Sequence, residues 1–176
     1  MFKVVIVEDD YMVSMLTRSC TERDKRFQVV KEFSTGKQAL PWLLSNPVDL
    51  LIMDVYMPVL TGTELLRELR IQESDVDVIV VTAAHETQTF SELFKMGIVD
   101  YLVKPFTAQR FQQALDNYCQ MRELEGQSRV SQSDIDKLLH QSPAKQIPKG
   151  LQEKTLEKIR SELNTREEQT CEAIAC

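Results

Sequence analysis

The stretch Leu50-Leu51-Ile52-Met53-Asp54 decides the fold, because it is a short apolar run that ends in an acidic residue. Uninterrupted apolar runs of this kind are typical of strands buried on both faces, as in parallel sheets that helices cover on both sides. Other runs along the chain have the same form, and each leads into a residue that can contact phosphate. They are Val4-Val5-Ile6-Val7 before Glu8, Val78-Ile79-Val80-Val81 before Thr82, and Tyr101-Leu102-Val103 before Lys104.

The residues that follow these runs are expected to lie together at one edge of the sheet. In open α/β sheets the reactive groups gather beyond the carboxyl ends of the strands. Glu8, Asp9 and Asp54 bring carboxylates to that edge, while Thr82 brings a hydroxyl and Lys104 an ammonium group. Mg²⁺ prefers oxygen ligands and typically takes one or two carboxylates from the protein. We therefore predict a magnesium site that Asp9 and Asp54 bind directly and Glu8 reaches through water.

Asp54 is the residue for which we predict covalent chemistry. A carboxylate held at the end of a buried strand can attack phosphorus and carry the group as an acyl phosphate. Lys104 would pair with one phosphoryl oxygen and Thr82 would donate a hydrogen bond to another, because phosphoryl transfer depends mainly on positioning and charge neutralisation. A single acid at such a place is more often a turn or capping residue, and Asp10 is assigned to that role. The presence of such residues at the ends of successive strands favours a site for phosphoryl chemistry over isolated capping roles.

The first 125 residues alternate between strand and helix. Strands are expected at 3–7, 27–33, 48–54, 77–82 and 100–103, and helices at 10–24, 37–45, 64–72, 86–96 and 108–125. The second strand is the most polar and is placed near an edge of the sheet. Met12, Val13, Leu16 and Cys20 lie at helical spacing and are expected to be the apolar face of the first helix. This alternation predicts an α/β fold with a five-stranded, doubly wound parallel sheet.

The composition fits a cytoplasmic protein that has enough apolar residues to form a hydrophobic core. Hydrophobic residues make up 43% of the 176 residues, and no apolar run approaches the roughly 20 residues that span a bilayer, so no membrane partner is expected. The net charge of −6 lies within the first 125 residues, and the remainder is neutral. Neither part carries a basic patch suited to nucleic acid.

The composition of the sequence changes after Gly126. Residues 127–150 are polar and contain prolines and a terminal glycine, which is typical of a linker. Residues 151–163 have amphipathic spacing, and Thr165-Arg166-Glu167-Glu168 is a capping box that begins a new helix. We expect a helical linker followed by an incomplete helical domain.

Four segments resemble, in order and spacing, the signature blocks of bacterial response regulator receiver domains. They are VVIVEDD (4–10), LLIMDVYMP (50–58), VIVVTAA (78–84) and DYLVKPF (100–106). The resemblance covers residues 1–122 and implies a flavodoxin-like receiver that is not an enzyme in its own right. It implies that Asp54 accepts a phosphoryl group from a sensor histidine kinase.

The same resemblance implies roles for the neighbouring residues. Glu8 and Asp9 would be the acidic pair, and Mg²⁺ would be bound by Asp9, Asp54 and the main-chain carbonyl of Tyr56. Lys104 would contact the phosphoryl group, and the peptide bond between Lys104 and Pro105 is expected to be cis. Thr82 and Tyr101 would be the switch pair, Tyr101 turning inward when Thr82 is drawn to the phosphoryl group.

The remainder is similar to one subfamily, the transcriptional regulators that answer citrate and C4-dicarboxylate sensor kinases. The residues that carry this are the long fifth helix, the polar spacer and Ile147-Pro148-Lys149-Gly150-Leu151. The implied domains are a receiver at 1–122, a helix extension and linker at 123–150, and the start of a truncated helix-turn-helix domain at 151–176. Promoter DNA would be a partner of the full-length protein and is not expected to bind this chain.

The implied function is a response regulator that switches a transcriptional output, with a stand-alone receiver acting through protein–protein contacts as the alternative. Phosphorylation is further expected to promote a homodimer through the fifth helix. Two rivals are disfavoured. A phosphohydrolase with an aspartyl nucleophile would need a second acid at Tyr56. A flavin protein would need a first loop without the acidic residues 8–10.

Overall fold

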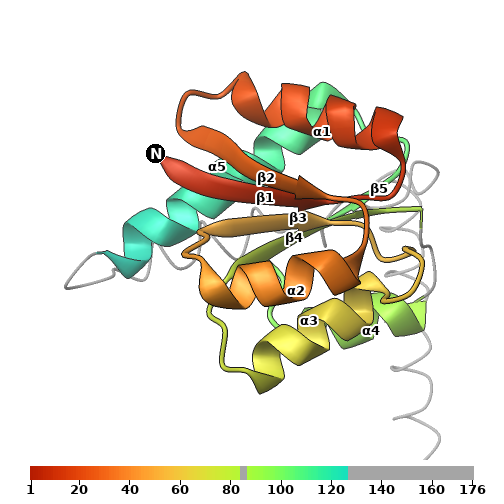
Figure 1. The fold of residues 1–176 in the computed structure, drawn as a ribbon. Helices are drawn as coiled ribbons and strands as arrows, with labels where there is room; N and C mark the ends of the chain where they lie inside the picture. The colour runs from red at the N-terminus through yellow and green to blue at the C-terminus, as the bar shows by residue number, and fades with distance from the viewer. Residues whose placement is uncertain (84–86, 127–176) are drawn as a thin grey trace, which may run out of the picture. The chain divides into compact units, whose positions relative to one another are not determined.

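In the computed structural model, which describes residues 1–83 and 87–126, five parallel strands form one sheet in the order β2-β1-β3-β4-β5 (Figure 1). The strands are β1 (Phe2–Val7), β2 (Phe27–Phe33), β3 (Leu50–Met53), β4 (Asp77–Thr82) and β5 (Asp100–Val103). The helices are α1 (Tyr11–Glu22), α2 (Gly36–Ser45), α3 (Gly62–Ile71), α4 (Thr87–Lys95) and α5 (Ala108–Glu125). The predicted doubly wound sheet is confirmed, with β2 at an edge. The predicted linker and helical domain at 127–176 lie outside the described residues.

The helix ends follow from capping residues. Asp10 caps α1 as predicted, since its side chain accepts hydrogen bonds from the main-chain nitrogens of residues 12 and 13. Thr107 caps α5 in the same way, as expected. Helix α3 begins at Gly62, earlier than expected, because Thr61 and Glu64 form a capping box in which each side chain bonds the other's main-chain nitrogen. Helix α4 ends before Gly97, whose φ of +78° favours glycine.

The sheet separates two apolar layers. Helices α1 and α5 cover one face, and α2, α3 and α4 cover the other (Figure 1). Alternate strand residues point to opposite faces, so Ile6 packs in the layer that contains Phe111 of α5, whereas Val7 packs with Leu66 of α3. Both faces of the central strands are therefore buried from solvent, which explains why their sequences are continuous apolar runs.

The apolar face predicted for α1 is wrong in part. Met12 and Leu16 are 71% and 51% exposed, and the helix packs on the sheet through Ser14, Thr17, Cys20 and Thr21. Two of these small side chains are hydrogen-bonded, since Ser14 Oγ donates to Glu32 of β2 at 2.8 Å and Thr21 Oγ1 donates to the main-chain carbonyl of Thr17 at 2.8 Å. The hydroxyl of Thr17 is buried without a hydrogen-bond partner among the described residues. Helix α1 thus leaves an apolar surface facing outward.

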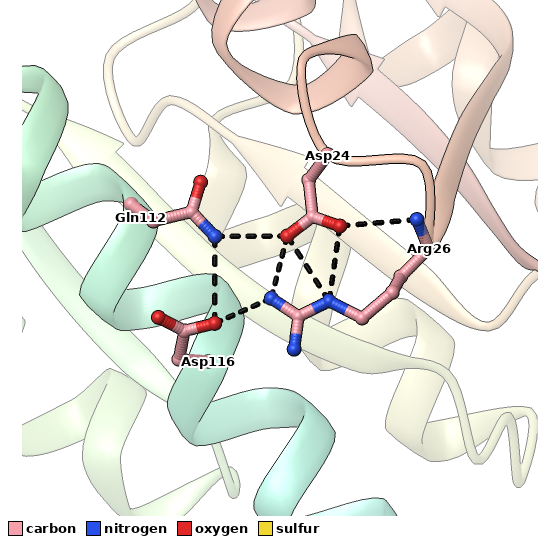
Figure 2. A network of polar contacts seen from close by, with 4 residues as sticks. All are labelled: Asp24, Arg26, Gln112 and Asp116. Carbon is pink, nitrogen blue, oxygen red and sulfur yellow. Dashed lines mark hydrogen bonds and ion pairs between the residues drawn. The ribbon is translucent and has the colours of Figure 1, made fainter.

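A polar network fastens the turn between α1 and β2 to α5 (Figure 2). Arg26 donates to Asp24 through Nε at 2.9 Å and through Nη2 at 2.5 Å, and it also pairs with Asp116 of α5. Gln112 Nε2 donates to Asp24 Oδ2 at 2.8 Å. The hydrogen bonds from Arg26 hold the pKa of Asp24 well below its usual range. The turn before β2 and helix α5 are therefore joined by charge as well as by apolar packing.

Candidate functional site

The strand-end residues meet because main-chain hydrogen bonding continues past the strands. Three of these residues donate their main-chain nitrogen to the strand beside them, which fixes where each side chain starts. The bonds are Glu8 N to Phe33 O at 3.0 Å, Asp54 N to Val7 O at 3.0 Å, and Lys104 N to Thr82 O at 2.8 Å. The parallel register thus brings side chains from β1, β3 and β5 to one edge, as predicted.

Lys104 lies at the centre of this group. Its Nζ donates to Glu8 Oε2 at 2.7 Å and to Asp54 Oδ2 at 2.6 Å. The other carboxylate oxygen of Asp54, Oδ1, accepts a hydrogen bond from the main-chain nitrogen of Tyr56 at 3.1 Å. Both oxygens of Asp54 are therefore held in place. The direct pair between Glu8 and Lys104 is a contact that sequence reasoning missed, because it treated Glu8 only as an acid near the metal.

Burial and pairing act against each other in this cluster. Glu8 is 5% and Asp54 is 7% exposed, whereas Asp9 is exposed. Burial raises the pKa of the Glu8 carboxyl, and the hydrogen bond from Lys104 only partly offsets this. Burial alone would lower the pKa of the Lys104 ammonium, but its carboxylate partners outweigh burial and raise that pKa. The side chain of Lys104 is consequently a stable positive charge among the neighbouring carboxylates.

The acidic cluster has the composition of a hard-cation site. Glu8, Asp9 and Asp54 each offer a carboxylate oxygen, and these oxygens lie within 4.8 Å of one another. An all-oxygen donor set suits Mg²⁺, which keeps several waters and therefore tolerates one exposed carboxylate such as Asp9. The residues fit the predicted ion. Ligation by the main-chain carbonyl of Tyr56 stays a prediction.

The predicted switch residues lie on the neighbouring strands β4 and β5. Thr82 is the last residue of β4 and is fully buried, and Tyr101 lies in β5, where it pairs with Val80. The ring of Tyr101 packs edge-to-face on Phe90 of α4, with ring centroids 5.3 Å apart. The peptide bond between Lys104 and Pro105 is cis, as predicted.

The loop after Asp54 has one unusual conformation that the sequence did not indicate. Val59 has a φ of 72°, in a region that β-branched residues rarely adopt, and its side chain is 77% exposed. No apolar burial of this side chain compensates for the backbone strain. Strained residues of this kind cluster near functional sites.

Replacing Val59 with asparagine is expected to raise the free energy of unfolding by about 1 kcal/mol, because asparagine tolerates the left-handed region. Val59→Ile is the matched control and should give no gain. Urea unfolding followed by the fluorescence of Trp42, the only tryptophan, measures both variants. Equal stability of the two would show that the loop holds no strain at Val59.

The architecture and this edge of the sheet define a class of protein: a parallel α/β domain that holds an acidic cluster and a lysine at its strand ends. The model of the response regulator receiver domain matches residues 4–116. The chain therefore belongs to the response regulator receiver family of two-component systems, as the sequence blocks indicated.

Curated relatives extend the similarity past the receiver. The chain is 38% identical over 182 residues to the transcriptional regulatory protein CitT of Halalkalibacterium halodurans, covering 99% of this chain and 79% of that protein. It is 39% identical over 175 residues to the transcriptional regulatory protein MalR of Bacillus subtilis, covering 97% of this chain and 74% of that protein. These relatives are named as regulators rather than enzymes.

A solved structure agrees with the fold. The receiver domain of AraT, a response regulator from Geobacillus stearothermophilus, is 28% identical with a TM-score of 0.65, covering 72% of this chain and 98% of that one. Within residues 1–83 and 87–126, the helices lack the length and apolar character that crossing a membrane requires.

Proposed function

We propose that Asp54 accepts a phosphoryl group, from a sensor histidine kinase or from a small phosphodonor, and that this switches a transcriptional output. The observation that carries the proposal is the position of the Asp54 carboxylate, which is buried, held at both oxygens, and placed beside an acidic pair and Lys104. Response regulators are phosphorylated by sensor histidine kinases, and this chain belongs to their receiver family.

In the proposed reaction a carboxylate oxygen of Asp54 forms a bond to phosphorus while the bond from phosphorus to the donor's leaving atom breaks. Lys104 moves from Asp54 Oδ2 to a phosphoryl oxygen and stays within reach of Glu8. Thr82 donates its hydroxyl to a second phosphoryl oxygen. Asp9, Asp54 and the main-chain carbonyl of Tyr56, with Glu8 through water, would hold Mg²⁺, which when bound would supply positive charge against the negative charge of the phosphoryl group. No separate acid or base is required for this transfer, because positioning and charge neutralisation supply most of the catalysis.

The output is proposed from the relatives. CitT and MalR are named transcriptional regulatory proteins, and the chain aligns with both beyond the receiver. We therefore infer a receiver at 1–122, a helix extension and linker at 123–150, and the beginning of a helix-turn-helix domain at 151–176. The regulated genes would concern citrate or C4-dicarboxylate metabolism, and promoter DNA would be the partner of the DNA-binding domain. The alternative, a stand-alone receiver, has no observation in its favour.

The outward apolar surface of α1 supports docking of a kinase. Tyr11, Met12, Met15 and Leu16 are 49–73% exposed, and α1 begins directly after Asp9 and Asp10 at the acidic cluster. An apolar patch next to a reactive site is typical of a protein interface. We infer that the kinase binds here while its phosphohistidine reaches Asp54.

Met15→Glu is expected to slow phosphorylation by a histidine kinase about tenfold or more, because a charge would be buried in the contact. The rate with acetyl phosphate, which needs no docking, should be unchanged and serves as the control. Radiolabel transfer from a kinase that phosphorylates the unchanged chain measures the first rate. An equal loss with both donors would contradict docking on α1.

The homodimer stays a prediction. The start of α5 is core packing, since Phe111, Ala114, Leu115 and Tyr118 are buried. In the described part of the chain, the exposed large apolar residues lie on other segments, so the surface of α5 adds no support. Sedimentation velocity with and without phosphodonor tests the dimer directly.

The test of the proposed function is intact mass spectrometry after incubation with acetyl phosphate. One added phosphoryl group is expected when Mg²⁺ is present and none after chelation. No adduct under either condition, together with no binding of beryllofluoride, would overturn phosphoryl acceptance.

A further inference from the structure

Aromatic rings contact one another in a row that leads from the surface of α4 to β5. Phe94 is 65% exposed and stacks on Phe90, with centroids 5.9 Å apart and an interplanar angle of 25°. Phe90 in turn meets Tyr101 edge-to-face, at 5.3 Å and 86°. Edge-to-face geometry is favourable because the positive ring edge meets a negative ring face. Phe90 therefore makes a specific contact with one of the proposed switch residues.

The main chain of Tyr101 is fixed on both sides. Its nitrogen donates to Asp100 Oδ1 at 2.7 Å, and its carbonyl accepts from Arg110 Nη2 at 3.4 Å. Arg110 and the buried Asp100 are themselves joined by two hydrogen bonds, of 2.6 and 3.0 Å. These contacts favour a rotation of the side chain over a movement of the main chain as the change at Tyr101. The partners of the ring then decide which position the ring prefers.

We propose that Phe90 is a positioning residue that holds the ring of Tyr101 in the arrangement in which Asp54 is paired with Lys104. This inference rests on the proposed function, in which Tyr101 turns toward Thr82 when the phosphoryl group draws that threonine in. Turning the ring toward Thr82 breaks its contact with Phe90. The contact therefore opposes switching, and a phosphoryl group must overcome it through its own preference for the switched state.

Phe90→Ala is expected to favour the switched arrangement, and by linkage to tighten the binding of beryllofluoride, which mimics the phosphoryl group. The free energy of an edge-to-face pair corresponds to roughly a two- to tenfold lower dissociation constant. The experiment is a titration of the whole chain with beryllofluoride and Mg²⁺, followed by main-chain amide NMR signals. Destabilisation of the fold alone would lower the melting temperature without tightening binding.

Two further variants separate the contact from general effects on α4. Phe94→Ala removes the neighbouring exposed ring and should leave the dissociation constant at the wild-type value, because Phe94 stacks on Phe90 rather than on Tyr101. Phe90→Tyr keeps the ring edge and should also behave as wild type. An unchanged or weaker affinity in Phe90→Ala overturns the role of Phe90 while leaving the proposed function intact. Failure of the wild-type chain to bind beryllofluoride overturns the role of Phe90, and the proposed function is overturned with it when acetyl phosphate also leaves no adduct.

Discussion

Asp54→Asn is expected to abolish phosphoryl incorporation from acetyl phosphate, by at least about a hundredfold, because an amide oxygen is a much weaker nucleophile than a carboxylate. The fold should survive the change. Asparagine has nearly the same shape, its carbonyl can still accept from the Tyr56 main-chain nitrogen, and Lys104 keeps its ion pair with Glu8. Intact mass spectrometry with Mg²⁺ present measures the incorporation directly.

Asp10→Asn is the matched control. Asp10 belongs to the same acidic segment, but its side chain caps α1, and asparagine is an equally good N-cap residue. This variant should be phosphorylated like the unchanged chain, which separates the loss of one negative charge near the site from the loss of the nucleophile. A stable adduct on Asp54→Asn would place the acceptor on another residue and contradict the proposed role.

The arrangement of the site could be predicted because it depends on topology. Parallel strands end at one edge, so apolar runs that end in Glu8, Asp54, Thr82 and Lys104 bring these residues together wherever the sheet forms. Pairing between the side chains could not be predicted in the same way. The direct contact of Lys104 with Glu8 depends on side-chain reach across the sheet and on burial, which periodicity does not report.

Helix α1 shows where hydrophobic periodicity fails. The pattern correctly indicates an amphipathic helix, yet Met12 and Leu16 face outward and Ser14 and Thr17 face the sheet. Small residues allow a helix to approach a sheet closely, and the hydroxyls of Ser14 and Thr21 are satisfied by the next strand and within the helix, respectively. A stripe of large apolar residues at helical spacing therefore marks either a core face or a surface for a partner, and spacing alone does not distinguish them.

Gly62→Ala is expected to lower the free energy of unfolding by about 3 kcal/mol or more, because a new methyl group would meet main-chain atoms that cannot move aside. A Cβ atom at Gly62 would lie 2.1 Å from the carbonyl oxygen of Asp54 and 3.0 Å from the Cα of Val55. The main-chain nitrogen of Gly62 also donates to Val55 O at 2.9 Å, so α3 sits directly against the segment that carries Asp54. Urea unfolding followed by Trp42 fluorescence measures the loss.

Two other glycines allow the same substitution with progressively less steric overlap, and they test this prediction. A Cβ at Gly36 would lie 2.9 Å from Leu60 O, a smaller overlap, and one at Gly126 would lie 3.6 Å from its nearest neighbour, an ordinary contact. The loss of stability should therefore fall from Gly62→Ala through Gly36→Ala to Gly126→Ala, the last within about 0.5 kcal/mol of the unchanged chain. Phosphorylation by acetyl phosphate should follow the same order under folding conditions, because movement of α3 displaces Asp54 itself. Equal stability of the Gly62 and Gly126 variants would mean that α3 does not approach Asp54 as closely as the structure shows.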